Sequence, residues 1–247
     1  MQSIGSTAFY GCTSLTTVTI PNSVKKIDEM AFAGCTGLTS ITLSNSLTSI
    51  GNSAFNSCES LTSVVIPNTV TTLGDRAFAY CSALKSVTLS DALTSLPEDV
   101  FNECSSLTSI TIPSTVTAIG TKAFYLCYRL NAINSKIVNV GDVTMGSQVF
   151  AGVDTETCSL TVPVGTVNAY RGAEQWKDFV NITDGESNAG DVNGDGNVDG
   201  GDINIIINII LGHANAADYG GRADVNSDGS VDGSDVNWII NHILGKN

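Results

Sequence analysis

The chain has 247 residues and a formal net charge of −13, from 24 acidic and 11 basic side chains. So acidic a chain lacks the clustered Lys and Arg that neutralise phosphates, which excludes nucleic-acid binding as its function. It has no run of 18 apolar residues, so no membrane span is predicted. Residues 185–247 hold 10 acidic and 2 basic side chains, against 14 and 9 in residues 1–184. This excess of carboxylates predicts a cation site in the tail.

The first half of the chain repeats the motif (Ala/Val)-Phe-x-x-Cys-x-x-Leu-x-x-(Val/Ile)-x-(Ile/Leu). The full motif occurs five times, and a sixth copy keeps its Phe, Cys and Leu. The residue number of each of these three positions rises by 23 from copy to copy, without a change of phase. Such a period is typical of a solenoid, in which each coil buries its apolar face by stacking on its neighbours. The repeated aromatic and thiol positions are Phe9, Phe32, Phe55, Phe78, Phe101 and Phe124, with Cys12, Cys35, Cys58, Cys81, Cys104 and Cys127. We expect each Phe to pack against the Phe of the next coil.

Each copy predicts one strand that alternates between inward apolar residues and outward polar ones. The expected strands are Leu15–Ile20, Leu38–Leu43, Leu61–Ile66, Leu84–Leu89 and Leu107–Ile112. Their outward Ser and Thr side chains form the candidate contact face, Thr17, Thr19, Ser40, Thr42, Ser63, Ser86, Thr88, Ser109 and Thr111. A purely solvated surface is the alternative, because Thr favours strands in any case. The functional interpretation is a shallow polar surface for a protein or a glycan.

The cysteines of the motif form a column in a stacked array, with a spacing of about 4.8 Å between neighbouring strands. Parallel side chains in register are poorly placed for the dihedral angle of a disulfide. No Cys-x-x-Cys pair is present for a metal or redox site. We therefore expect buried free thiols that pack as small apolar groups, while Cys158 lies outside the period.

The period breaks after Leu130, since it would place the next phenylalanine at position 147 and the chain has Phe150 instead. We expect an inserted loop at residues 134–147, a last strand at Leu160–Pro163 and a helix over Thr166–Phe179. An atypical last unit of this kind covers the open end of a solenoid. The sequence has no signal peptide, and Met1 leads directly into the middle of a repeat, so we expect that it starts inside a longer array.

The repeat resembles the bacterial leucine-rich repeat of the BspA surface-antigen type, from residue 1 to about 183. The resemblance implies a right-handed, β-rich solenoid of a secreted or surface-attached bacterial protein that works by binding. It divides the chain into a solenoid at residues 1–184, with a C-terminal cap from about residue 142, a linker at residues 185–190 and a tail module at residues 191–247.

Two segments of the tail match each other, one starting at Asp191 and the other at Asp224. Both place oxygen-bearing side chains at positions 1, 3, 5, 9 and 12 of a loop with Gly at position 6, while position 7 contributes its backbone carbonyl, which is the pattern of an EF-hand calcium loop. The candidate ligands are Asp191, Asn193, Asp195, Asn197, Asp199 and Asp202 in the first loop, and Asp224, Asn226, Asp228, Ser230, Asp232 and Asp235 in the second. Two calcium ions are therefore predicted, one in each loop.

Each loop runs into an apolar helix, Ile203–Leu211 or Val236–Leu244, but no helix pattern precedes it. A duplicated calcium loop of this kind resembles a type I dockerin. The resemblance implies calcium-dependent folding and docking onto a cohesin module of a scaffold. Loop positions 10 and 11, which help to choose the partner in that family, are here Gly200 with Gly201 and Gly233 with Ser234. The alternative is a calcium-stiffened module without a docking role.

The sequence predicts no enzyme. Its two histidines, His213 and His242, both follow or end the tail helices, so the repeats have no base that could activate a Ser or Cys nucleophile. We expect a non-catalytic binding or adhesion protein outside the cell or on a bacterial surface. Its expected partners are a cohesin-type module or other surface protein, and a host protein or glycan. The alternative is a structural or substrate-proximal component of a polysaccharide-degrading complex.

Overall fold

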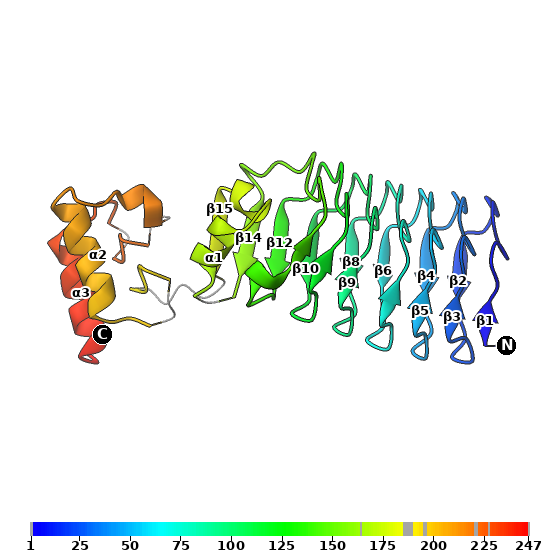
Figure 1. The fold of residues 1–247 in the computed structure, drawn as a ribbon, viewed down its shortest axis with the longest axis horizontal. Helices are drawn as coiled ribbons and strands as arrows, with labels where there is room; N and C mark the ends of the chain where they lie inside the picture. The colour runs from blue at the N-terminus through cyan, green and yellow to red at the C-terminus, as the bar shows by residue number, and fades with distance from the viewer. Residues whose placement is uncertain are drawn as a thin grey trace.

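The structure is a computed structural model, which describes residues 2–163, 165–184, 190–194, 197–219, 222–226 and 228–246. Figure 1 shows coils of parallel strands stacked along the long axis from the N-terminus, followed by a tail with two packed helices. The predicted fold class, a β-solenoid followed by a small helical module, is confirmed. In the described parts of the chain, no helix is long and apolar enough to cross a bilayer.

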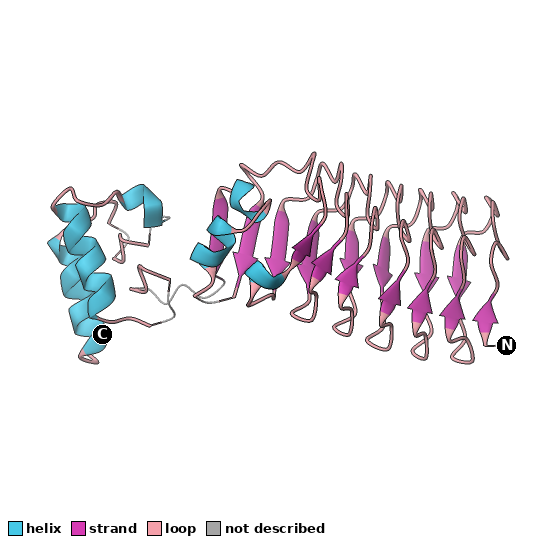
Figure 2. Ribbon diagram, in the orientation of Figure 1, coloured by secondary structure: helices cyan, strands magenta, loops and turns pink. Residues whose placement is uncertain are grey.

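The coils contribute the candidate contact face through a first row of parallel strands (Figure 2). In the regular coils each residue pairs with its equivalent in the next coil, as Ser63 does with Ser86 and Thr17 with Ser40. β2 and β4 form a two-stranded sheet, and the other six strands form a continuous one. The row consists of β2 (Thr17–Thr19), β4 (Ser40–Thr42), β6 (Ser63–Val65), β8 (Ser86–Thr88), β10 (Ser109–Ile112), β12 (Ala132–Ser135), β14 (Ser159–Val162) and β15 (Asn181–Asp184).

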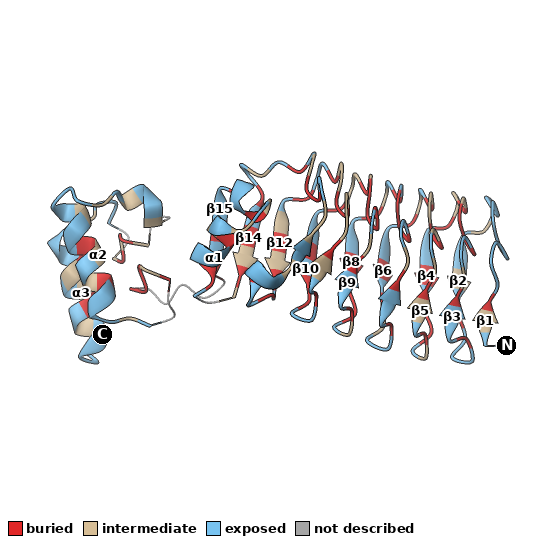
Figure 3. Cartoon of the chain, viewed as in Figure 1, coloured by how far each residue is buried: buried red, intermediate tan, exposed pale blue. Residues whose placement is uncertain are grey.

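A second row of shorter parallel strands lies on another side of each coil, where the sequence shows only a repeated apolar pair. Its inward residues, such as Ile27 and Ile50, are 1% exposed. The row consists of β1 (Ser3–Ile4), β3 (Lys26–Ile27), β5 (Ser49–Ile50), β7 (Thr72–Leu73), β9 (Ser95–Leu96), β11 (Ala118–Ile119) and β13 (Thr144–Met145). Figure 3 shows the same alternation of buried and exposed residues recurring from coil to coil.

The core of the solenoid contains a column of stacked phenylalanines from Phe9 to Phe150. The centroids of neighbouring rings lie 5.0 to 5.8 Å apart and the ring planes differ by 3° to 16°. The prediction that each Phe packs on the next is confirmed. Because rings such as Phe55 and Phe78 are fully buried, each removes a large apolar area from water.

The thiols form a second column beside the rings. All seven cysteines are free, which confirms the prediction for the six of the motif; for Cys158 no state was predicted. From Cys35 to Cys127, each Sγ donates to the carbonyl of the Phe in the preceding coil, at 3.1 to 3.3 Å. Burial raises the pKa of Cys81 and of Cys127 to about 12, so both stay protonated and apolar. Cys12, in the first coil, is exposed, so the prediction of a buried thiol is wrong at this position.

The corners that carry the Phe residues are joined by a regular ladder of backbone hydrogen bonds. In the fifth corner, the N–H groups of Asp99, Phe101 and Glu103 donate to carbonyls of the sixth at 2.8 to 2.9 Å. The same three donors recur in all six corners from Thr7 to Leu126. Two of the three have a positive φ, as at Asp99 (55°) and Glu103 (58°), which turns the chain while the N–H groups point along the stack.

Two predictions for the end of the solenoid are wrong. Residues 134–147 are not a plain loop, because β12 and β13 continue both rows, and the three extra residues are taken up around the 3-10 helix η1 (Val140–Asp142). The expected helix over Thr166–Phe179 is divided into α1 (Val167–Gly172) and the 3-10 helix η2 (Trp176–Asp178). Gln175, with φ of 62°, reverses the chain between them. Strand β15, which follows them, was not predicted.

The cap buries large aromatic residues of the segment Thr166–Phe179 against the end of the stack. Tyr170 and Trp176 are fully buried, and the Trp176 ring lies 4.9 Å from that of Phe150. The Tyr170 hydroxyl donates to the carbonyl of Ile137 at 2.8 Å. These contacts end the Phe column with a set of rings in tilted and edge-on packing.

The tail has a small core of its own, formed by Val192, Ile206, Ala223, Val225 and Ile239. Helix α2 (Gly200–Ile210) and helix α3 (Gly233–Ile243) pack against each other, and the 3-10 helix η3 (Ala216–Tyr219) precedes the second loop. Both α-helices begin three residues earlier than predicted, so Asp202 and Asp235 lie inside the first helical turn.

Candidate functional site

The second calcium loop is the more completely described of the two, and its carboxylates face its own backbone. The two oxygens of Asp224 accept the N–H groups of Asp228 (3.1 Å) and Gly229 (2.9 Å). Asp228 in turn accepts the N–H of Ser230 at 2.9 Å. The acidic side chains of this loop therefore hold its backbone in a turn.

The last acidic residue of each loop has the same environment. Asp202 is fully buried, and its Oδ1 accepts the N–H groups of Val192 (2.7 Å) and Asn193 (3.0 Å). Asp235 is also fully buried, and its Oδ1 accepts from Val225 (2.9 Å) and Asn226 (3.3 Å). The identical arrangement ties the start of each loop to the start of the helix that follows it.

The ninth loop positions, Asp199 and Asp232, are the N-caps of α2 and α3. Each forms a reciprocal capping box with the buried Asp three residues later, which satisfies backbone donors of the first turn. The backbone N–H and the hydroxyl of Ser234 lower the pKa of Asp232. Gly200 and Gly201, like Gly233 and Ser234, are the first two residues of a helix and not part of the loop itself.

The remaining first-loop residues are placed in part. Asp191 is 2% exposed and its Oδ1 accepts the N–H of Gly194 at 2.8 Å. Asn193 and Asn197 lie among the described residues and take part in further contacts. Asp195, together with residue 196, lies outside the described residues.

The donor set of the loops fits a calcium ion, although the side chains do not converge on one point. In the described residues, no three His, Cys, Asp or Glu side chains form a metal site. In the second loop the Asn226 amide nitrogen donates to Asp228 Oδ2 (2.9 Å) and Ser234 Oγ (2.7 Å). Exchanging the nitrogen and the oxygen of this amide would present its oxygen to the same point, and only oxygen ligands suit a hard cation. No Lys or Arg of the described residues forms an ion pair inside either loop.

Exposed apolar residues occur in matching pairs on the two tail helices. Ile207 and Ile240 are 38% and 39% exposed, while Leu211 and Leu244 are 60% and 59% exposed. Ile210 and Ile243 form a third pair, at 46% and 47%. The sequence analysis missed these residues, although their equivalent places in the two copies, after the buried Ile206 and Ile239, are a signal that it could have used. Apolar groups clustered in this way are candidates for a docking surface.

The tail contacts the solenoid cap through two arginines that were not predicted to be functional. Arg222 Nη1 lies 3.4 Å from Oδ1 of Asp184, the last residue of β15. Arg171 of α1 donates from Nη1 to the carbonyl of Asp218 at 2.8 Å. Arg222 is one of only two basic residues in residues 185–247, which is the one sequence signal that could have identified it.

The Ser and Thr residues predicted to form a contact face lie in two rows and are exposed. Ser40, Ser63, Ser86 and Ser109 form one row across successive strands, and in the described structure none of these hydroxyls makes a hydrogen bond within the chain. The threonines that directly precede the strands do form such bonds. The hydroxyls of Thr39 and Thr62 donate to backbone carbonyls of the preceding coil at 3.0 and 3.3 Å. The side chains of Thr17, Thr19, Thr42, Thr88 and Thr111 are exposed as well.

Comparison with known proteins is consistent with both modules. The chain matches the family model of the BspA type leucine rich repeat region in six copies over residues 2–131, and that of the dockerin type I domain over residues 189–244. None of the curated proteins matches the chain.

Similar solved structures are bacterial leucine-rich repeat proteins. The chain is 31% identical to the Treponema pallidum leucine rich repeat protein, with a TM-score of 0.57, over 62% of this chain and 70% of that one. A leucine-rich repeat protein from Bacteroides ovatus is 23% identical over 74% of this chain and 67% of that one, with a TM-score of 0.46. The pneumococcal vaccine antigen PcpA is 25% identical over 55% of this chain and 36% of that one, with a TM-score of 0.48.

Proposed function

Because the chain belongs to the BspA type leucine rich repeat family and carries a dockerin type I domain, we propose that it is an extracellular assembly protein with two contact surfaces. Both families are non-catalytic binding domains, so the chain has a role in protein interaction and complex assembly. In this proposal the calcium-loaded tail docks onto a cohesin-type module, while the solenoid face contacts a second partner. The duplicated loop and helix, with its duplicated exposed surface, is the observation that carries the proposal.

Calcium organises the docking module in this account. One ion per loop is held by oxygen ligands of the first loop (Asp191, Asn193, Asp195, Asn197, Asp199 and Asp202) and of the second (Asp224, Asn226, Asp228, Ser230, Asp232 and Asp235). The ion offsets the mutual repulsion of the carboxylates in each loop, and so couples metal binding to the folding of the tail. Since each loop is tied to its helix through Asp202 or Asp235, a calcium ion in the loop would also brace the first turn of α2 or α3.

The docking surface combines the exposed apolar pairs with the first residues of the helices. Leu211 and Leu244, with Ile207 and Ile240, expose apolar area to solvent, and burying this area against a partner is favourable. Gly201 and Ser234 occupy equivalent places beside Asn193 and Asn226, respectively. A glycine leaves a flat surface and a serine adds one hydroxyl, so these positions tune the choice of partner.

The solenoid face is the second contact surface. The hydroxyls of this face lie in register on parallel strands. The face is almost uncharged, and Lys85 is the charged residue that lies next to the rows. An extended neutral array suits a ligand that forms many weak hydrogen bonds, such as a glycan or a flat protein surface. The location outside the cell or on a bacterial surface follows the usual occurrence of both families, and protease treatment of intact cells would test it.

A pull-down with cohesin-type modules of the source organism tests the docking function. We expect the full chain to be retained in calcium and released by a chelator. The double variant Leu211→Glu with Leu244→Glu should lose retention, because both copies of the surface are changed. Val138→Glu, at a residue 59% exposed on the solenoid, serves as the matched control and should be retained. Failure of every cohesin module to retain the chain in calcium would contradict the proposal.

A further inference from the structure

A seventh corner, at residues 147–153, stacks on the sixth in the regular way. The Phe150 ring lies 5.7 Å from that of Phe124, with the planes differing by 4°. The N–H groups of Lys122, Phe124 and Leu126 donate to its carbonyls at 3.0, 3.0 and 2.8 Å. Gln148 and Gly152 have positive φ values of 56° and 94°. This corner therefore has the backbone shape of the six before it, although Val153 replaces the Cys.

No eighth corner follows among the described residues, so the outgoing ladder of the seventh has no continuation. The equivalent donors are the N–H groups of Gln148, Phe150 and Gly152, and by the register of the stack they point to the place of the missing corner. Within the described residues, none of these three groups has a hydrogen-bond acceptor, whereas every equivalent group in the earlier corners has one. Backbone N–H groups bond either to the protein or to water, so these three are open to an acceptor from another molecule.

The cap completes this edge at one point only. The side-chain amide of Gln175 accepts the N–H of Val149 at 2.7 Å and donates to the carbonyl of Gly146 at 2.5 Å. In the sixth corner the equivalent groups, Ala123 N–H and the Gly120 carbonyl, bond directly at 3.2 Å. The side chain of Gln175 thus bridges the two groups of the turn and ties the cap to the corner at this point.

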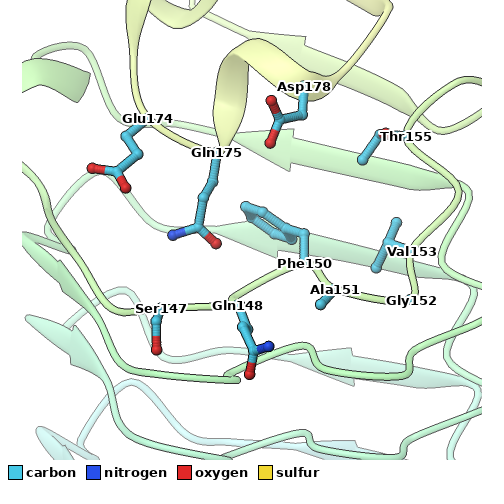
Figure 4. A pocket seen from close by; sticks show the side chains of 10 residues that line it. All are labelled: Ser147, Gln148, Phe150, Ala151, Gly152, Val153, Thr155, Glu174, Gln175 and Asp178. Atoms are coloured by element: carbon cyan, nitrogen blue, oxygen red, sulfur yellow. The ribbon is translucent and has the colours of Figure 1, made fainter.

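A pocket of about 470 Å³ lies on this side of the corner. Figure 4 shows residues of the corner, such as Ser147 and Gln148, along one side and Glu174, Gln175 and Asp178 of the cap along the other. Phe150, Gly152 and Gln148, which carry the three donors, all line it. The lining includes two carboxylates and no Lys or Arg, and neither carboxylate has an ion-pair partner among the described residues.

We propose that this pocket binds a basic peptide segment of a protein partner. Every second carbonyl of the segment would accept an N–H group, from Gln148, Phe150 and Gly152 in turn, as alternate carbonyls of the next corner do in the earlier coils. A Lys or Arg side chain of the segment would pair with Glu174 and Asp178. Addition of a chain to an open row of backbone donors is an established mode of peptide recognition, and this site is independent of calcium and of the tail.

The other ligand classes fit the pocket less well. The carboxylates of Glu174 and Asp178 repel an anion, although the three donors alone would attract one. Phe150 is only 5% exposed, so it offers little ring surface on which a sugar could stack. A peptide satisfies the donors and the carboxylates together, and its affinity should fall with rising salt because the carboxylates lie at an open pocket.

An NMR titration of the full chain tests the proposal. The probe is acetyl-Gly-Thr-Lys-Ala-Phe-Tyr-Leu-amide, which copies residues 120–126, the corner whose carbonyls accept the bonds from the fifth. We expect the amide signals of Gln148, Phe150 and Gly152 to shift and their hydrogen exchange to slow. The double variant Glu174→Gln with Asp178→Asn should weaken binding at least tenfold. Glu156→Gln, an exposed acid of the same coil, should leave the binding unchanged.

Several results would overturn the proposal. One is the absence of shifts at these amides at millimolar peptide, and another is equal binding of a probe in which glutamate replaces the lysine. Shifts that depend on protein concentration without peptide would identify a second copy as the occupant. In the free chain the Phe150 amide should exchange faster than those of Phe101 and Phe124, and equal protection of all three would show that the donors are not open.

Discussion

Arg222 Nη1 lies 3.4 Å from Oδ1 of Asp184, and this ion pair joins the calcium-loop module to the last strand of the solenoid. The Asp184 side chain is only 2% exposed and also accepts the N–H of Gly165 at 3.3 Å. On the other side, a Cβ at Gly194 of the first calcium loop would lie 2.6 Å from the same Nη1. One guanidinium is therefore packed between a calcium loop and the end of the β-solenoid.

Removing either member of this pair should loosen the tail from the cap. A charge left buried without its partner is strongly destabilising, so Arg222→Gln and Asp184→Asn should each lower the melting temperature. In a double-mutant cycle we expect a coupling energy on the order of 1–2 kcal/mol. Arg129→Gln, at an exposed residue of the sixth coil, is the control for loss of one positive charge. A coupling energy of zero would show that the two side chains do not interact in solution.

The Phe column should dominate the stability of the solenoid. Phe78 is fully buried between two rings, whose centroids lie 5.2 and 5.8 Å away. Phe78→Ala leaves a cavity in the middle of the stack and should cost about 3–5 kcal/mol. Tyr80→Ala, two residues further on, removes a side chain that is 41% exposed and should cost less than about 1 kcal/mol. Urea denaturation of both variants makes the comparison.

The close approach of successive coils should make the replacement of Gly74 destabilising. A Cβ at Gly74 would fall on the backbone N of Asn52 in the preceding coil. Because backbone atoms cannot give way easily, Gly74→Ala should destabilise the chain by about 1–3 kcal/mol. Gly141→Ala is the matched control, since nothing lies within 4 Å of its Cβ position. Equal melting temperatures for the two variants would contradict the observed coil spacing.

The buried thiols should make the solenoid sensitive to alkaline pH. Burial raises the pKa of Cys81 from 9.0 to about 12, so the folded chain retains a proton that the unfolded chain loses. Stability is then unaffected below pH 9 and falls between pH 9 and 12, by about 1.4 kcal/mol per pH unit for each such thiol. Cys81→Ala should reduce this slope, which thermal unfolding between pH 8 and 11 can measure. An unchanged slope would show that this thiol ionises in the folded state.

Residues that repeat could be placed from the sequence, and residues held by single long-range contacts could not. The constant period places Phe55, Cys58 and the hydroxyl rows because every coil solves the same packing problem. The break between α1 and η2 depends on Gln175, whose amide bonds to residues in the preceding corner. No local pattern indicates such a contact, so a continuous helix was the natural prediction.

The tail shows the same division. The ligand spacing of the loops and the glycines that end the helices, Gly212 and Gly245, were readable, and both glycines have the positive φ expected of that place. The helices start earlier than predicted because Asp199 and Asp232 form capping boxes. Both residues had been assigned to the metal, so their capping role was not recognised in the sequence. The partner of Arg222, Asp184, lies far away along the chain and leaves no trace in the sequence.

A calcium titration of the chelator-treated full chain, followed by calorimetry and circular dichroism, tests the central claim most directly. We predict that two ions bind and that the helical signal increases, because the loops gather their ligands only around the metal. The variant Asp224→Ala with Asp228→Ala, changed in the second loop alone, should bind a single ion. If the chain binds no calcium and its helical signal stays constant, the tail is not a calcium-dependent docking module.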